Sequence, residues 1–176
     1  SLGLFTHPTD DKKVYSIYPG EGLFEFTFDQ NQIKEGLYSW KKVNTNFNFL
    51  DFTSFSIQVP YYGIQKEDIK CFICTEKHGL YVSKEATLFE QWENKGLPEE
   101  WQKVNSIGLS KFKKELLMFG LDGRGIIKTE DQGLKWTQNN SGLLANSITD
   151  FIIDLSDKNT FYVTSYSSVF ISNNKG

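Results

Sequence analysis

The chain has 176 residues, a net charge of −3 at pH 7 and many aromatic residues, including 15 Phe, 8 Tyr and 4 Trp. Acidic and basic residues are interspersed, so no phosphate-binding surface is indicated and we expect no nucleic-acid partner. No run of about 18 or more apolar residues occurs, so we expect no membrane span. Abundant aromatic residues, with little Ala or Met, favour β-strands.

Short apolar runs alternate with small polar loops from the first residues onward. Residues 3–10 are predicted to be a strand with its exit turn, and residues 14–24 to be two strands around a loop. The pattern of strand, polar loop and second strand recurs at residues 71–83, 117–129 and 161–172. Each of these later units is preceded by a further predicted strand, at residues 55–59, 105–109 and 148–153.

The recurrence has a period typical of one architecture. Its anchors are Gly22, Gly79, Gly125 and Ser168, which lie 57, 46 and 43 residues apart. Repeats of about 40–50 residues are typical of β-propellers, whose blades are four-stranded antiparallel sheets. We therefore predict an all-β single domain, a partial β-propeller of about three and a half blades. The expected blades are residues 1–50, 51–101, 102–144 and 145–176, the last incomplete, with a helical turn at 98–103.

Residues 129–136, Thr-Glu-Asp-Gln-Gly-Leu-Lys-Trp, form the most specific motif of the chain. In a tight hairpin, the Asp131 carboxylate is expected to cap backbone N–H groups, and Gly133 to supply a left-handed conformation. The Thr129 hydroxyl adds a weaker local bond. Trp136 is predicted to pack its apolar face beneath the turn, with its indole N–H free to find a carbonyl. We interpret all four residues as structural.

This motif resembles the Asp-box of the BNR-repeat, sialidase-type β-propellers, whose pattern is Ser/Thr-x-Asp-x-Gly-x-x-Trp. The resemblance implies a hairpin at the outer rim of a blade, away from the axis where ligands usually bind. A weaker copy is formed by Ser172, Asn174 and Gly176, with Asn in place of Asp. In the first unit, Trp40 lies eleven residues after Asp29, so we expect either a longer hairpin or no true Asp-box there.

Cys71 and Cys74 have the spacing of a metal or redox pair. In a β-strand, however, residues three apart point to opposite faces, so the pair is poorly placed to bridge or to share a metal. Two Cys without a second ligand pair are also a weak zinc signal. We expect two buried free thiols, no metal and no cofactor.

The turns between the second and third strands of each blade are expected to share one face with the loops between blades, where propellers carry most ligand sites. Carboxylates, a His and aromatic side chains on this face could bind a glycan by stacking and hydrogen bonding. The candidate binding residues are Tyr18, Glu21, Glu76, His78, Asp122, Arg124, Tyr166 and Trp101, with Asn46, Phe47, Glu99 and Asn146 on the loops between blades.

Enzymatic function is constrained by the basic residues. A sialidase grips its substrate carboxylate with several arginines, whose planar fork matches a carboxylate. The chain has one Arg, Arg124, against 18 Lys, which disfavours a sialidase. Xyloglucan-degrading glycoside hydrolases also use Asp-box propellers, so a fragment of one is an open alternative, with Glu21 and Asp122 as a possible acid/base pair. No residue is assigned as catalytic.

Residues 8–15 and 22–24 resemble the blades of photosystem II assembly-factor-type and sortilin-type propellers. That resemblance implies a non-catalytic binding platform for a protein, peptide or glycan, in an extracellular, periplasmic or luminal compartment. Because 176 residues hold fewer blades than a closed ring, we expect a fragment of a longer polypeptide, or else two copies that complete one ring.

Overall fold

The computed structural model describes residues 3–7, 9–36, 39–43, 45–58, 70–83, 89, 91–110, 112–113, 115–154 and 156–174. For residues 32, 57 and 58, which lie within a helix or a strand, the main chain is described but the side chain is not. The structural findings below concern these residues.

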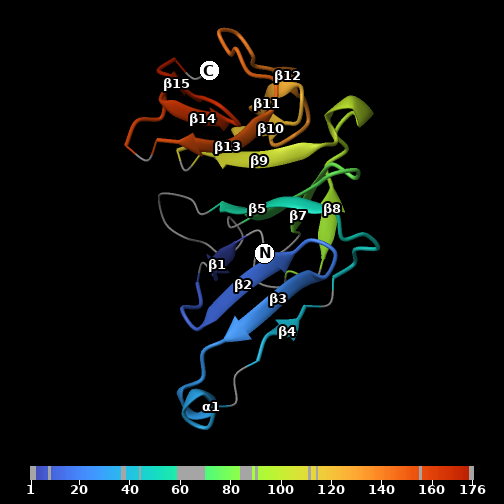
Figure 1. The fold of residues 1–176 in the computed structure, drawn as a ribbon, viewed down its shortest axis with the longest axis vertical. Helices are drawn as coiled ribbons and strands as arrows, with labels where there is room; N and C mark the ends of the chain where they lie inside the picture. Colours follow the sequence, from blue (N-terminus) through green and yellow to red (C-terminus); the bar gives the residue numbers. More distant parts are fainter. Residues whose placement is uncertain are drawn as a thin grey trace.

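The described chain folds into four antiparallel sheets; in Figure 1 the first lies below, the second in the middle, and the third and fourth together at the upper end. We call them blades 1 to 4. Blade 1 contains β1 (Leu4–Thr6), β2 (Lys13–Tyr18), β3 (Gly22–Thr27) and β4 (Lys41–Lys42). Blade 2 contains β5 (Phe52–Gln58), β6 (Lys70–Thr75), β7 (Leu80–Ser83) and β8 (Trp92–Asn94). Blade 3 contains β9 (Val104–Leu109), β10 (Leu117–Leu121), β11 (Gly125–Thr129) and β12 (Thr137–Gln138). Blade 4 contains β13 (Ile148–Ile153), β14 (Phe161–Ser165) and β15 (Val169–Ser172).

Two short helical segments lie between strands. The 3₁₀ segment η2 (Glu99–Trp101) connects blades 2 and 3, as the helical turn predicted at 98–103 requires. Helix α1 (Gln30–Lys34) lengthens the β3–β4 connection, and the Asp29 carboxylate accepts the Asn31 N–H at its start, at 2.8 Å. Of the two alternatives expected from the position of Trp40, the structure has the longer hairpin.

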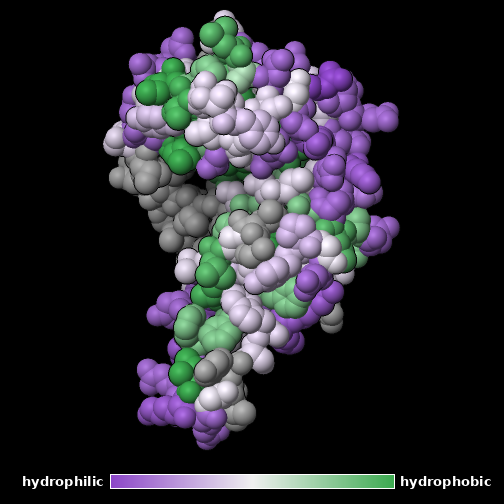
Figure 2. All heavy atoms as spheres, in the orientation of Figure 1, coloured by the Kyte–Doolittle hydropathy of each residue, from purple (hydrophilic) through white to green (hydrophobic). Residues whose placement is uncertain are grey.

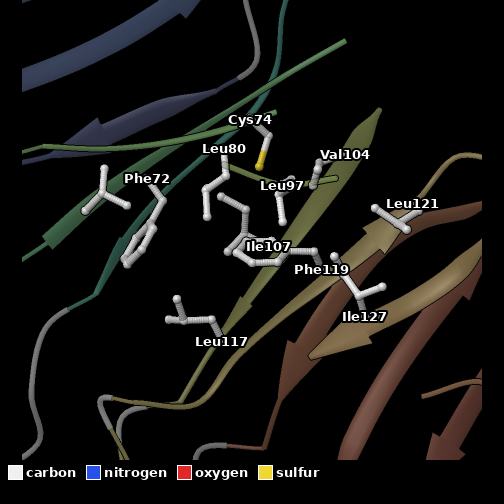
Figure 3. Close-up of a cluster of buried hydrophobic side chains, with 11 residues drawn as sticks. Phe72, Cys74, Leu80, Leu97, Val104, Ile107, Leu117, Phe119, Leu121 and Ile127 are labelled. Atoms are coloured by element: carbon white, nitrogen blue, oxygen red, sulfur yellow. The ribbon is translucent and has the colours of Figure 1, made fainter. Parts of the chain in front are cut away.

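The core consists of three hydrophobic clusters, one between each pair of neighbouring blades. Side chains alternate across each middle strand, so one strand contributes to two clusters. On β10, Phe119 faces blade 2, whereas Met118 faces blade 4. Figure 3 shows the central cluster, in which side chains from blades 2 and 3 interdigitate. The blades are therefore held to one another by burial on both faces.

Cys71 and Cys74 on β6 follow the same alternation. Both thiols are free and fully buried, Cys71 in the cluster between blades 1 and 2 and Cys74 in the cluster between blades 2 and 3. The expectation of two buried free thiols on opposite faces is confirmed. Burial raises the pKa of Cys71 to about 12, although a hydrogen bond with the Ser83 hydroxyl opposes the shift, and burial also raises the pKa of Cys74.

Because only the thiolate is nucleophilic, these raised pKa values predict unreactive cysteines. In native buffer at pH 8, neither Cys71 nor Cys74 should react with Ellman's reagent over the time in which a free thiol reacts completely. In denaturant, both should react. Two equivalents of rapid reaction without denaturant would contradict the burial of both thiols.

Apolar side chains are exposed at the two ends of the arc. Blade 4 exposes Ile152, Val169 and Ile171 on the face away from blade 3, and Ile152 and Ile171 lie in register on either side of Tyr162. Blade 1 exposes Leu4 and Trp40. Figure 2 shows hydrophobic residues gathered over the fourth sheet at the upper left and along the first sheet at the lower left. Exposed apolar faces of this kind are usually association sites.

Candidate functional site

The turn at residues 129–136 joins β11 to β12 through a network of short hydrogen bonds. The Thr129 hydroxyl donates to the Asp131 carboxylate at 2.7 Å and accepts the Asp131 and Gly133 N–H groups at 3.2 and 2.9 Å. The Asp131 carboxylate accepts the Lys135 N–H at 2.9 Å. That bond, with the one from Thr129, holds the pKa of Asp131 below its usual value. Gly133 has a φ of 95°, which a side chain would strain.

Trp136 packs beside this turn, against Phe119 of β10 with ring centroids 5.0 Å apart. Its side chain is half-buried at the edge of the central cluster. Its indole N–H, which was free to find a carbonyl, finds none: among the described residues no acceptor reaches the buried Nε1–H. Trp92, in contrast, is buried and donates its Nε1–H to the Phe89 carbonyl at 2.7 Å.

The weaker copy of the motif begins with the same local geometry. The Ser172 hydroxyl donates to the Asn174 side-chain oxygen at 2.8 Å and accepts the Asn174 N–H at 3.5 Å. These bonds repeat those between Thr129 and Asp131. Gly176 lies outside the described residues.

The three tryptophans that follow the blade hairpins should form a graded stability series. We expect Trp92→Ala to lower the free energy of unfolding by about 4–5 kcal/mol, since it empties a buried site. Trp136→Ala should cost about 3 kcal/mol because its ring is half-buried, and the 42% exposed Trp40 should cost under about 1 kcal/mol on replacement by Ala. Urea denaturation of the three variants measures the series. A near-neutral Trp136→Ala would contradict its packing role.

The expected sharing of one face by turns and inter-blade loops is visible in the backbone hydrogen bonds. Gly20 and Glu76 donate their N–H groups to the carbonyls of Leu50 and Asp51, each 2.8 Å away. In blade 3, Asp122 N–H donates to the Lys103 carbonyl at 3.1 Å. Each bond joins a turn between second and third strands to a residue that leads into a blade. These turns of blades 1, 2 and 3 therefore lie on one face with the loops that lead into blades 2 and 3.

Charged groups from blades 2 and 3 meet on this face around Lys103, which the sequence reasoning did not single out. The Lys103 ammonium lies 2.6 Å from one oxygen of the Asp122 carboxylate and 3.9 Å from the Glu76 carboxylate. The Ser147 hydroxyl, from the loop leading into blade 4, donates to the other Asp122 oxygen at 3.0 Å. We call Glu76, Lys103, Asp122 and Ser147 the Lys103 cluster. The only sequence signal for Lys103 was its place just before a strand.

Each partner in this cluster shifts the other's proton affinity. The hydrogen bond and charge of Asp122 raise the pKa of Lys103, to which Glu76 and Tyr166 add. Hydrogen bonds from Lys103 and Ser147 hold the pKa of Asp122 below its usual value. Asp122 is thus held as a carboxylate, which suits an acceptor and disfavours the role of general acid.

The remaining candidates have diverse surroundings. His78 stacks on Phe49 at 4.3 Å, with its Nε2 3.6 Å from the Asp51 carboxylate. Trp101 is half-buried against the central cluster. The Asn46 side chain accepts the Trp92 N–H at 2.9 Å and donates to the Trp92 carbonyl at 3.0 Å. The Phe47 ring packs beside the Trp92 ring. Tyr18, Glu21, Arg124 and Tyr166 are exposed, as are Glu76, Glu99 and Asn146.

The Lys103–Asp122 pair makes a pH prediction. A lowered carboxyl pKa contributes stability that is present above the unfolded value of about 3.9 and lost as pH falls through the folded value. A raised lysine pKa contributes stability that is present below a pH of about 10.4 and is lost as pH rises through the folded value.

In an NMR titration of the Asp122 side-chain carbon, Lys103→Met should therefore move the midpoint upward. Lys158→Met, on the exposed β13–β14 loop, should leave it unchanged, and equal midpoints in all three proteins would contradict the pairing.

Within the described ranges, no group of three or more His, Cys, Asp or Glu side chains is arranged to hold a metal ion. The helices described there are too short or too polar to cross a membrane.

No protein-family model matches the chain, and no curated protein sequence matches it. Solved structures resemble it over nearly its whole length. An ancestral GH74 enzyme superposes with a TM-score of 0.69 at 17% identity, covering 99% of this chain and 23% of that one. The GH74 xyloglucanase from Xanthomonas campestris gives 0.66 at 14% identity, covering 99% and 29%.

The extracellular domain of a protein described as a hybrid two-component system from B. thetaiotaomicron gives a TM-score of 0.66 at 13% identity, covering 96% of this chain and 21% of that one. The chain thus spans under a third of the length of each of these three proteins. With three sheets of four strands and one of three in sequence, the chain has the predicted fold, an all-β partial β-propeller.

Proposed function

We propose that the chain is part of a non-catalytic binding propeller, whose turn face recognises a protein, peptide or glycan partner. The observation that carries the proposal is the Lys103 cluster. There the best-placed carboxylate, Asp122, is neutralised by an ammonium 2.6 Å away and a hydroxyl 3.0 Å away. Around it lie the exposed Tyr166, Arg124 and Glu76. Mixed charge beside exposed aromatic groups suits recognition of a polar partner.

A hydrolase reading is the second candidate, because two of the similar structures are GH74 enzymes, one of them a xyloglucanase. A glycosidase needs two carboxyl groups of different protonation state, about 5–10 Å apart across the scissile bond. Glu21 and Asp122 were the sequence-based pair. Glu21 is exposed on the blade 1 turn, whereas the Asp122 carboxylate is already engaged by its two partners. The binding reading is therefore the better supported one.

The hydrogen bonds of the 129–136 turn support a structural assignment of Thr129, Asp131, Gly133 and Trp136 as an Asp-box, as proposed from the sequence. Ser172 and Asn174 repeat the first step of that network. We assign these residues a structural role in their hairpins. We assign the binding role to the opposite face, which carries the turns between the second and third strands of each blade.

The test combines a hydrolysis assay with a binding screen on the same protein. The chain should release no reducing ends from tamarind xyloglucan, and it should select ligands from a glycan array or a displayed peptide library. Lys103→Met and Asp122→Asn should weaken binding of a selected ligand by about tenfold or more, as expected for a charge-assisted contact.

Lys158→Met is the matched control, since it removes one exposed lysine at the far loop of blade 4, and it should leave that affinity unchanged. Reducing-end release that is lost in Asp122→Asn would overturn the binding proposal in favour of the hydrolase. Selected ligands that are indifferent to both cluster substitutions would place binding elsewhere and equally contradict it.

A further inference from the structure

A cavity of about 320 Å³ lies between blades 2 and 3, at one end of the central cluster. Its floor is apolar and is formed by the buried side chains of Phe72, Val82 and Leu117. In Figure 3, Phe72 and Leu117 lie at the opposite end of the cluster from Leu121. Both blades have four strands, so the cavity belongs to an interface between two complete sheets.

Two lysines line the cavity from blade 2, and the 129–136 turn lines it from blade 3. Lys70 begins β6 and Lys95 follows β8, and the side chains of both are half-buried. A half-buried lysine typically covers apolar surface with its aliphatic stem and keeps its ammonium in water. The turn contributes Asp131, Gln132 and Leu134. The cavity therefore combines an apolar floor with a few polar groups, as small-molecule sites do.

Gln132 has an unusual backbone conformation for a residue with a side chain. Its φ is 61°, in the left-handed region that glycine favours, and its N–H donates to the Glu115 carbonyl at 3.3 Å. Its side-chain oxygen accepts a hydrogen bond from the Lys70 ammonium at 2.9 Å, across the interface between blades 2 and 3. Strained residues persist where their surroundings hold them, and they are frequent at ligand sites. Gln132 thus holds the head of Lys70 at the mouth of the cavity.

The charges at the mouth favour an anion. The cavity is lined by two lysines and one carboxylate, on a chain whose net charge is −3. That carboxylate, Asp131, already accepts the Thr129 hydroxyl and the Lys135 N–H, so it is engaged by its own hairpin. The Lys95 ammonium lies 3.4 Å from the Glu93 carboxylate, and a contact between such partly exposed groups contributes little energy. Because an ammonium has three N–H donors, Lys95 can bind a second carboxylate at the same time.

We propose that this cavity binds a small amphipathic carboxylate, an organic acid with a short apolar chain. The chain occupies the space above the apolar floor, and the carboxylate stays at the mouth, where Lys70 and Lys95 bind it. Gln132 is the positioning residue for Lys70. A volume of about 320 Å³ is at the low end for ligand pockets, which favours a chain of about six carbons over a bulkier ligand. The proposal is independent of the turn face.

Hexanoate is the probe, and the methyl groups of the cavity floor are the reporters. In a methyl-labelled sample of the intact chain, the NMR signals of Val82 and Leu117 should shift with hexanoate and saturate, whereas those of Leu121 should not shift. Hexanamide lacks the charge and acetate lacks the chain, so each should bind at least about tenfold more weakly than hexanoate. The first comparison measures the charge-assisted contact, and the second measures burial of the chain.

Three charge variants locate the carboxylate. Lys95→Met keeps an apolar stem and removes the ammonium, so it should weaken hexanoate binding by about tenfold and leave hexanamide binding unchanged. Lys158→Met, on the far loop of blade 4, is the matched control and should bind hexanoate like the parent protein. Glu93→Gln removes the competing carboxylate beside Lys95 and should strengthen hexanoate binding.

Gln132→Gly separates a positioning role from a structural one. Glycine adopts a positive φ without strain, so this variant should melt at the same temperature as the parent protein or higher. It should nevertheless bind hexanoate several-fold more weakly, because Lys70 loses the amide that holds it.

Any of three results overturns the proposal: floor signals that do not saturate at tens of millimolar hexanoate, equal binding of hexanoate and hexanamide, or unchanged hexanoate affinity in Lys95→Met. A Gln132→Gly variant with the affinity of the parent protein overturns the role assigned to Gln132. The methyl signals of Leu121 and Ile127, which belong to the same cluster but do not line the cavity, show in each variant that the interface is folded.

Discussion

Burial of both faces of the middle strands is the constraint on which the rest of this structure depends. Strands β6 and β10 each send alternate side chains into two different clusters, so removing one blade would expose half of the next. Because neither face is available to solvent, these strands are continuous apolar runs, Cys71–Phe72–Ile73–Cys74 and Leu117–Met118–Phe119. Burial on both faces thus accounts for the apolar runs and for the two buried thiols of β6.

The same constraint explains where polar chemistry is possible. With the faces of the middle strands covered, two of the polar networks lie at turns on opposite edges of the arc. At one edge, the hydroxyl and carboxylate of Thr129 and Asp131 satisfy the backbone of a tight hairpin. At the other, Lys103 bridges carboxylates of two blades. A turn that saturates its own polar groups is structural, whereas a cluster that ties neighbouring blades together and still faces solvent can recognise a partner.

The interfaces between neighbouring blades differ at their outer edges. Between blades 1 and 2, and again between blades 2 and 3, a tryptophan from the later blade closes the interface at its rim. Between blades 3 and 4 the corresponding volume is a cavity beside an open strand edge. Ile152 and Ile171 are exposed on the face of blade 4 that points away from blade 3.

The amino-acid sequence by itself determined the fold class, the repeat and the conformation of the 129–136 turn, because these depend on residues close together in the chain. It also determined that Cys71 and Cys74 lie on opposite faces, since side chains alternate along a strand. Only the tertiary structure decided which side chains meet across blades. Lys103 reaches Asp122, Asn46 reaches Trp92, and the Trp136 indole is left without an acceptor among the described residues. Such pairings depend on how successive sheets pack against each other. The spacing of residues along the chain does not determine the distance between side chains of two different sheets.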